Sequence, residues 1–163
     1  MARDEFDSAT SIPKVENALG LLHGTTPKIE AAIATHKKNN DSKNMMQTLE
    51  RRDAHHKMIK QHENLLGLLK SGDFDKHVST ARDIQKAEAA LPPRPTREST
   101  PKEWDDHADA TRKVMGMRGP IERLMGSIPP HAYNKLSFPG LTPVKHWSDA
   151  MLEDAQNHHS SWK

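Results

Sequence analysis

The sequence predicts an all-α protein. A long central helix over about residues 42–70 belongs to a helical hairpin or bundle, and a second, smaller helical subdomain follows a proline-rich spacer. The apolar content is carried by Ala, Leu and Met, which favour helices. No stretch alternates β-branched residues with the period of two that indicates a strand. The dipeptide Thr-Pro, an N-cap residue followed by proline at the first helical position, occurs at 26–27, 100–101 and 142–143.

The predicted core is thin for a chain of 163 residues. A domain of this length can bury most of its apolar surface, but hydrophobic residues make up only 34% of this chain. Leu, Ile, Val and Phe account for about 17%, below the roughly 20% at which disorder becomes an option. Disorder also needs a high net charge, whereas 24 basic side chains nearly balance 22 acidic ones here. We therefore expect a folded helical protein that buries few large side chains.

Proline and polar stretches divide the chain into five predicted segments. These are a polar N-terminal arm (1–10), a helical hairpin or bundle (11–91), a proline-rich spacer (92–99), a C-terminal helical subdomain (100–157) and a C-terminal tail (158–163). The spacer contains three prolines, which lack the N–H that a helix or a central strand needs. We expect it to be extended and to separate two subdomains.

Local signals predict the helices before the spacer. A short helix should end at Gly24, and Thr26-Pro27 should open the next one, which the turn at Asn39-Asn40 ends. Residues 42–70 contain no proline and one glycine, so they should form one continuous helix, antiparallel to residues 27–38.

The apolar stripe of this long helix is interrupted. Its predicted members are Met45, Met46, Leu49, Ile59, Leu66 and Leu69. In the middle, Arg52, Asp53, His55 and His56 occupy positions where aliphatic residues would be expected. A helix with such a polar middle is either exposed there or packed against a polar partner.

The second half of the chain should hold three more helices. Thr100-Pro101 followed by Glu103 has the residues of a capping box. Glycines and Pro120 should interrupt that helix, and a second short helix should end at Pro129-Pro130. Residues 129–141 are expected to be irregular, and Thr142-Pro143 should open the last helix.

Several classes of protein are excluded or disfavoured by composition. No apolar run approaches the 18 residues that read as a membrane span. The N-terminal residues are acidic where a signal peptide would be basic, so we expect a soluble chain, intracellular or within a particle, that no signal peptide exports. The absence of Cys excludes disulfides, thiol catalysis and cysteine-based zinc or iron–sulfur sites.

No pattern in the sequence predicts catalysis, a metal or a cofactor. There is no P-loop, no dinucleotide fingerprint and no nucleophile elbow. The 11 histidines offer only pairs, such as Asp53 with His56 and Glu103 with His107, and two ligands are too few for a metal site. His158-His159 indicates no specific role. We therefore expect no enzyme activity, no metal, no cofactor and no small-molecule substrate.

The long helix carries a basic section. Its members are Arg51, Arg52, Lys57 and Lys60, which are candidates for contacts with phosphates or with an acidic partner surface. Aromatic residues are not interleaved with them, so base stacking is not supported. A solvated helix face explains the same charges, which makes nucleic-acid binding the weaker alternative.

Methionines and tryptophans are the candidates for contacts with other proteins. Met45 and Met46 could form an adaptable surface, although filling the core is the ordinary role of Met. Trp104, Trp147 and Trp162 are potential anchors. Trp162 follows a polar stretch, so it should dock back onto the domain or into a neighbouring chain.

These observations favour a non-enzymatic structural protein. The thin core and polar ends suit a subunit of a larger multiprotein particle, for example a minor component of a virus or phage, that contacts other protein subunits through its helices. A nucleic-acid-associated protein, a regulatory or adaptor module and an enzyme are the alternatives, in that order.

Overall fold

The computed structural model describes residues 8–140 and 145–162, and these are helical to 83%. Strands are absent from these residues, so the all-α prediction is confirmed. The helices are α1 (Ser8–Lys38), α2 (Ser42–Ser71), α3 (Asp73–Ala89), α4 (Pro101–Met125), α5 (Pro130–Ser137) and α6 (Trp147–Ser161). None of these helices is long and apolar enough to cross a membrane.

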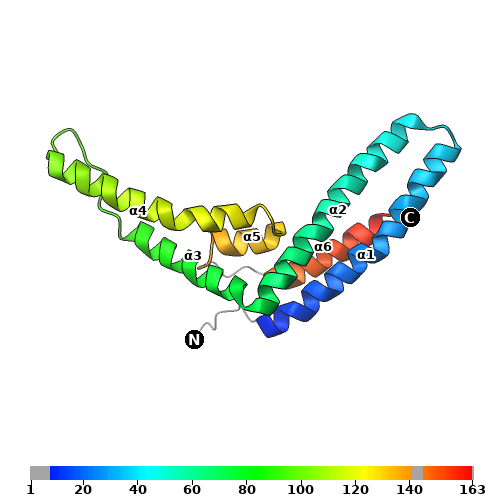
Figure 1. Cartoon of the computed structure of the whole chain (residues 1–163), viewed down its shortest axis with the longest axis horizontal. Helices are drawn as coiled ribbons and strands as arrows, with labels where there is room; N and C mark the ends of the chain where they lie inside the picture. Colours follow the sequence, from blue (N-terminus) through cyan, green and yellow to red (C-terminus); the bar gives the residue numbers. More distant parts are fainter. Residues whose placement is uncertain (1–7, 141–144, 163) are drawn as a thin grey trace.

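The helices form two arms that meet at an angle (Figure 1). The first arm contains α1, α2 and α6, and the second contains α3, α4 and α5. In the first arm α2 runs antiparallel to α1, whereas α6 runs parallel to α1, as the pairs Lys14–Asp149 and Thr25–His159 show. Each arm takes helices from both sides of residues 92–99, which hold neither helix nor strand. The division of the chain into five segments, with a separate C-terminal subdomain, stays a prediction.

The long helix α2 is continuous, as predicted. The Asp41 side chain caps its first turn by accepting a hydrogen bond from the backbone N–H of Asn44, at 3.2 Å. Gly72 ends it with φ of 81°, a left-handed conformation that glycine adopts without strain. Gly72 also precedes α3, so this one residue turns the chain from the first arm into the second.

Two predicted interruptions are wrong. Residues 8–38 form one helix through Gly24 and Pro27, and residues 101–125 form one helix through Pro120. In α1 the buried stripe continues past the proline from Leu22 to Ile29, so tertiary packing overrides the local stop signal. In α4 Val114 and Ile121 bury the same face on either side of the glycines and Pro120.

The chain after α4 also differs from expectation. Part of the segment predicted to be irregular forms α5, because Pro130 occupies the first helical turn, where its missing N–H is not needed. The predicted start of the last helix at Thr142-Pro143 lies outside the described residues, and α6 begins at Trp147. Residues 158–161 of the predicted tail belong to α6, and residues 8–10 of the predicted arm belong to α1.

The largest apolar cluster lies where the arms meet, and we call it the junction. Its buried members are Val15, Leu65, Leu69, Phe74, Val78, Ile84, Val114, Ile121, Ile128, Ala132, Leu136, Trp147 and Met151. All six helices contribute to it. A smaller cluster of Ala18, Leu22 and Ala155 continues into the first arm. The core is thus concentrated at the junction, and each arm becomes thinner away from it.

The buried stripe of α2 is more polar than predicted. Thr48, His55, His62 and Leu69 recur at every seventh residue and are buried, together with Leu65. Of the predicted apolar stripe only Leu69 is buried, and Met46 is 63% exposed. In the polar middle of α2, His55 and Arg52 pack against polar partners, whereas Asp53 and His56 are exposed, so each of the two options that the sequence left open holds for part of it.

Replacement of Phe74 by Ala tests the junction. Because this ring has no exposed surface, its removal leaves a cavity and should lower the free energy of unfolding by about 3–5 kcal/mol. Urea unfolding followed by circular dichroism measures the change. Met46→Ala is the matched control on an exposed apolar side chain and should change stability by less than about 0.5 kcal/mol. Equal effects of the two variants would contradict the assignment of the junction as the main core.

Candidate functional site

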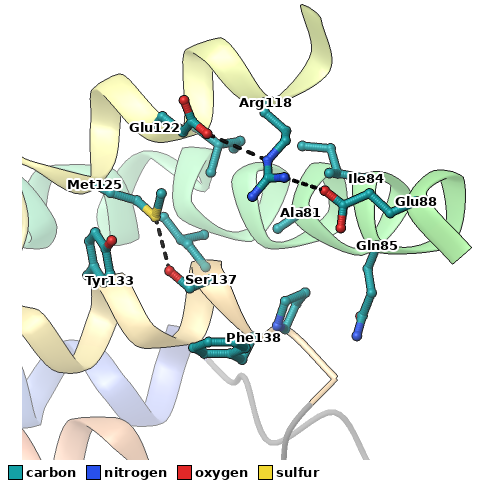
Figure 2. A pocket seen from close by; sticks show the side chains of 13 residues that line it. Ala81, Ile84, Gln85, Glu88, Arg118, Glu122, Met125, Tyr133, Ser137 and Phe138 are labelled. Carbon is teal, nitrogen blue, oxygen red and sulfur yellow. Dashed lines mark hydrogen bonds and ion pairs between the residues drawn. The ribbon is translucent and has the colours of Figure 1, made fainter. Parts of the chain in front are cut away.

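The second arm contains a groove between α3, α4 and α5 (Figure 2). Its volume is about 600 Å³. Ala81, Ile84, Ile121, Met125 and Leu136 form its apolar floor. A cavity of this size can take a large side chain or a small molecule.

Helical spacing places the lining residues. Ala81, Ile84, Gln85 and Glu88 follow one another on one face of α3 at the spacing i, i+3, i+4, i+7. Arg118, Ile121, Glu122 and Met125 repeat this spacing on α4. The apolar members of both helices form part of the floor. The charged members of the two helices lie together at one end of the groove.

The charged wall of the groove is a three-residue network. Arg118 Nη1 lies 2.7 Å from Glu88 Oε1 on α3, and Arg118 Nε lies 3.5 Å from Glu122 Oε1 on α4 (Figure 2). The Arg118 side chain is about half exposed, so these ion pairs add little to stability. Two carboxylates facing one guanidinium leave this wall with a net negative charge.

The rim of the groove is aromatic. Tyr133 on α5 and Phe138 just after it are both exposed apolar side chains. The Ser137 hydroxyl between them donates a hydrogen bond to Met125 Sδ, at 3.3 Å. A thioether cannot accept the proton of an attacking hydroxyl, so this arrangement does not activate Ser137 as a nucleophile. Apolar floor, aromatic rim and negative wall suit the binding of an apolar or cationic side chain.

The predicted interface residues divide into two groups. Met45 is half-buried, and Met46 and Trp104 are exposed, so both exposed side chains are accessible to a partner. Trp147 and Trp162 are each only 5% exposed within this chain. The Trp147 ring lies 5.7 Å from the Phe74 ring at the junction. Trp162 docks back onto the first arm, which is one of its two predicted positions.

The members of the predicted basic section differ in their contacts. The Arg51 guanidinium lies 3.8 Å from the centre of the Trp162 ring, in cation–π geometry. Arg52 Nη1 lies 3.3 Å from Glu30 Oε1 on α1. Lys57 and Lys60 are exposed. Two of the four predicted phosphate-binding cations therefore have partners within the chain.

The two pairs considered as metal ligands have no third ligand beside them among the described residues. Within residues 8–140 and 145–162, no group of three or more His, Cys, Asp or Glu side chains is arranged to hold a metal ion. Asp53 with His56 and Glu103 with His107 therefore remain pairs.

The groove was not found from the sequence. The repeated spacing of 81–88 and 118–125 is visible there, and it shows that each helix has a mixed apolar and charged face. It does not show that the two faces lie opposite one another, because that depends on the turn through residues 92–99. The aromatic rim comes from a segment that was expected to be irregular.

A double-mutant cycle tests the contact between Arg51 and Trp162. The cycle compares Arg51→Ala, Trp162→Leu and the double variant. Because each single substitution removes the same cation–π contact, we expect a coupling energy of about 0.5–2 kcal/mol between them. Urea unfolding measures the three free energies. Lys57→Ala with Trp162→Leu is the control pair and should be additive. A coupling as small as that of the control would refute the contact.

Comparison of the chain with models of protein families, with curated proteins and with solved structures finds no match. No residue role is therefore transferred from a relative. The groove, the exposed apolar side chains and the charges described above are the observations on which a function can be based.

Proposed function

We propose that this chain is a non-enzymatic protein that acts as a subunit of a larger multiprotein assembly, through contacts of its helices with other proteins. The observation that carries the proposal is a set of large apolar side chains left exposed, by 40% to 65% of their surface. These are Met46, Trp104, Met115, Tyr133 and Phe138. Exposed aromatic and Met side chains are enriched in protein interfaces.

Four of these five side chains lie in the second arm. Trp104 and Met115 occupy the same face of α4, about three turns apart. Tyr133 and Phe138 flank the groove. Residues 101–113 of α4 include no buried side chain, although they form more than three helical turns. This half of α4 contributes little to the core of the chain. Its side chains are therefore available for contacts with a partner.

The groove offers the most defined place for a contact. An apolar or aromatic side chain of a partner can enter between Tyr133 and Phe138 and reach the floor formed by Ile84 and Leu136. A Lys or Arg beside it would meet the negative wall of Glu88 and Glu122. An anchor in a pocket with a charged rim is the arrangement that dominates binding energy in protein interfaces.

Nucleic-acid binding has less support. It would use the basic section of α2, but Arg51 and Arg52 already contact Trp162 and Glu30. Lys57 and Lys60 alone would give weak binding with a shallow salt dependence. That the assembly is a virus or phage particle stays a prediction.

Site-specific photocrosslinking tests the proposal. Phe138 is replaced by benzoylphenylalanine in the full chain, which is produced in its native source and irradiated there. We expect a discrete crosslinked product that contains one protein partner, because Phe138 stands at the rim of the groove. Asp53, which is exposed on α2, carries the same reagent in the control and should give no such product. Identical products at both positions, or none at position 138, would contradict the proposal.

Hydrogen exchange along α4 gives a second test. In the isolated chain the amides of residues 105–113 should exchange faster than those of residues 114–125, because only the latter part of α4 packs on the junction. In the native assembly the difference should become smaller as a partner covers the first part. Uniform protection along α4 in the isolated chain would show that this half needs no partner.

A further inference from the structure

A buried histidine joins all three helices of the first arm. His55, in the middle of α2, is fully buried. Its Nε2 lies 2.9 Å from Thr26 Oγ1 on α1. Its Nδ1 lies 3.0 Å from Nε2 of His158 on α6. His55 is thus the side chain through which α2 contacts both neighbours at this level of the arm.

One neutral form of this histidine satisfies all of these hydrogen bonds. The Thr26 hydroxyl donates to the backbone carbonyl of Leu22, at 3.4 Å, so its oxygen accepts from Nε2–H of His55. Nδ1 of His55 then carries no proton and accepts from Nε2–H of His158. One added proton can be shared between the two facing ring nitrogens, but when both rings are protonated two N–H groups stand against each other at 3.0 Å.

The neighbouring threonine holds the end of α6 in a similar way. The Thr25 hydroxyl donates to the Leu21 carbonyl at 2.7 Å, so its oxygen accepts from Nδ1–H of His159 at 2.8 Å. Lys28 Nζ donates to the carbonyl oxygen of His159, at 3.2 Å. The last turn of α6 is therefore attached to α1 and α2 mainly by polar contacts of two adjacent histidines.

The charged groups around this cluster oppose a further proton. His23 and Lys28 face it from α1, Arg51 and His56 from α2, and His159 from α6. The carboxylates of Glu30 and Glu63 on these helices are paired with Arg52 and His23. Protonation of the His55–His158 pair would thus add positive charge to a basic and buried place.

Trp162 depends on the same contacts. It follows the last turn of α6, is 5% exposed and lies under the Arg51 guanidinium. Its indole N–H is buried and finds no hydrogen-bond acceptor among the described residues. A buried donor without an acceptor weakens the docking of this residue, so loss of the histidine contacts should release it.

We propose that the His158–His55–Thr26 chain of hydrogen bonds is an acid-sensitive latch, which holds the C-terminal end of α6 and Trp162 against α1 and α2 at neutral pH and releases them on acidification. The junction, with Trp147 at the other end of α6, stays folded when the latch opens. The device makes the surface under the C-terminal end of α6 accessible only at acid pH.

The pKa shifts of His55 and His158 have the direction that the latch requires. Burial, and then His158 and His56, lower the pKa of His55 from 6.5 to about 4. Burial, and then the charge of Arg51, lower the pKa of His158. The open form therefore binds more protons than the closed form between about pH 6.5 and pH 4, so the closed form loses stability as the pH falls through this range. About one pH unit or more above 6.5 both forms are neutral at these groups, and the pH no longer destabilises the closed form.

Fluorine NMR of the full chain labelled with 5-fluorotryptophan tests the latch. Tryptophan-to-phenylalanine variants assign the three signals. Between pH 7.5 and 4.5 we expect the Trp162 signal to move to a solvent-exposed position while the Trp147 signal and the circular dichroism of the helices stay unchanged. His158→Gln keeps a donor toward His55 without the titrating ring and should lower the midpoint by at least half a pH unit. His77→Gln, which removes a histidine from α3, should leave the midpoint unchanged.

Three results would overturn the latch. Trp162 could stay buried down to pH 4.5, or become exposed only together with Trp147 and the loss of helix, which would be global unfolding. His158→Gln could also behave as His77→Gln does. If His158→Gln fails to fold, His55→Gln with the same readout replaces it, since its amide can still donate to Thr26.

Discussion

The apolar junction between the arms is the constraint on which the rest of the structure depends. Phe74 at the start of α3 packs against Trp147 at the start of α6, with ring centres 5.7 Å apart, and Leu69 from the end of α2 lies in the same cluster. Three helices thus begin or end at one buried place, and their directions away from it define the two arms (Figure 1). A chain poor in large aliphatic residues has enough of them to fill one such cluster, and few remain for the rest of each arm.

Inside the first arm, polar side chains occupy several of the buried positions. His55 and His62 occupy buried positions of α2 where leucine would stabilise a helix pair more, and His55 is hydrogen-bonded to both neighbouring helices. The ring nitrogens of His55 find their hydrogen-bond partners in only one arrangement of the helices, because a shift by one turn would leave a buried ring nitrogen without a hydrogen bond. His55 thereby contributes to the register of α1, α2 and α6, whereas His62 is hydrogen-bonded to the Met58 carbonyl within α2.

The second arm uses its residues differently. Its helices α3 and α4 carry faces that are apolar near the junction and charged farther away, so they enclose a groove and leave aromatic side chains at its rim (Figure 2). The junction holds the floor of this groove through Ile84, Ile121 and Leu136, which belong to both. A rigid floor with an exposed rim is suited to a contact with another protein, and the adjacent unburied half of α4 extends that surface.

The sequence by itself determined the helical class, the extent of α2 and the cap at Thr100, because each depends on residues within one or two turns. Only the tertiary structure decided that α1 continues through Pro27, that His55 lies inside, and that α3 faces α4 across a groove. These features depend on contacts between distant residues, as in the bond from His55 to His158, 103 positions later. Proline in a helix interior costs about 3 kcal/mol, whereas burial of each large side chain is worth about 1.5–3 kcal/mol. Burial of Leu22 and Ile29 on the two sides of Pro27 therefore prevails over the local stop signal.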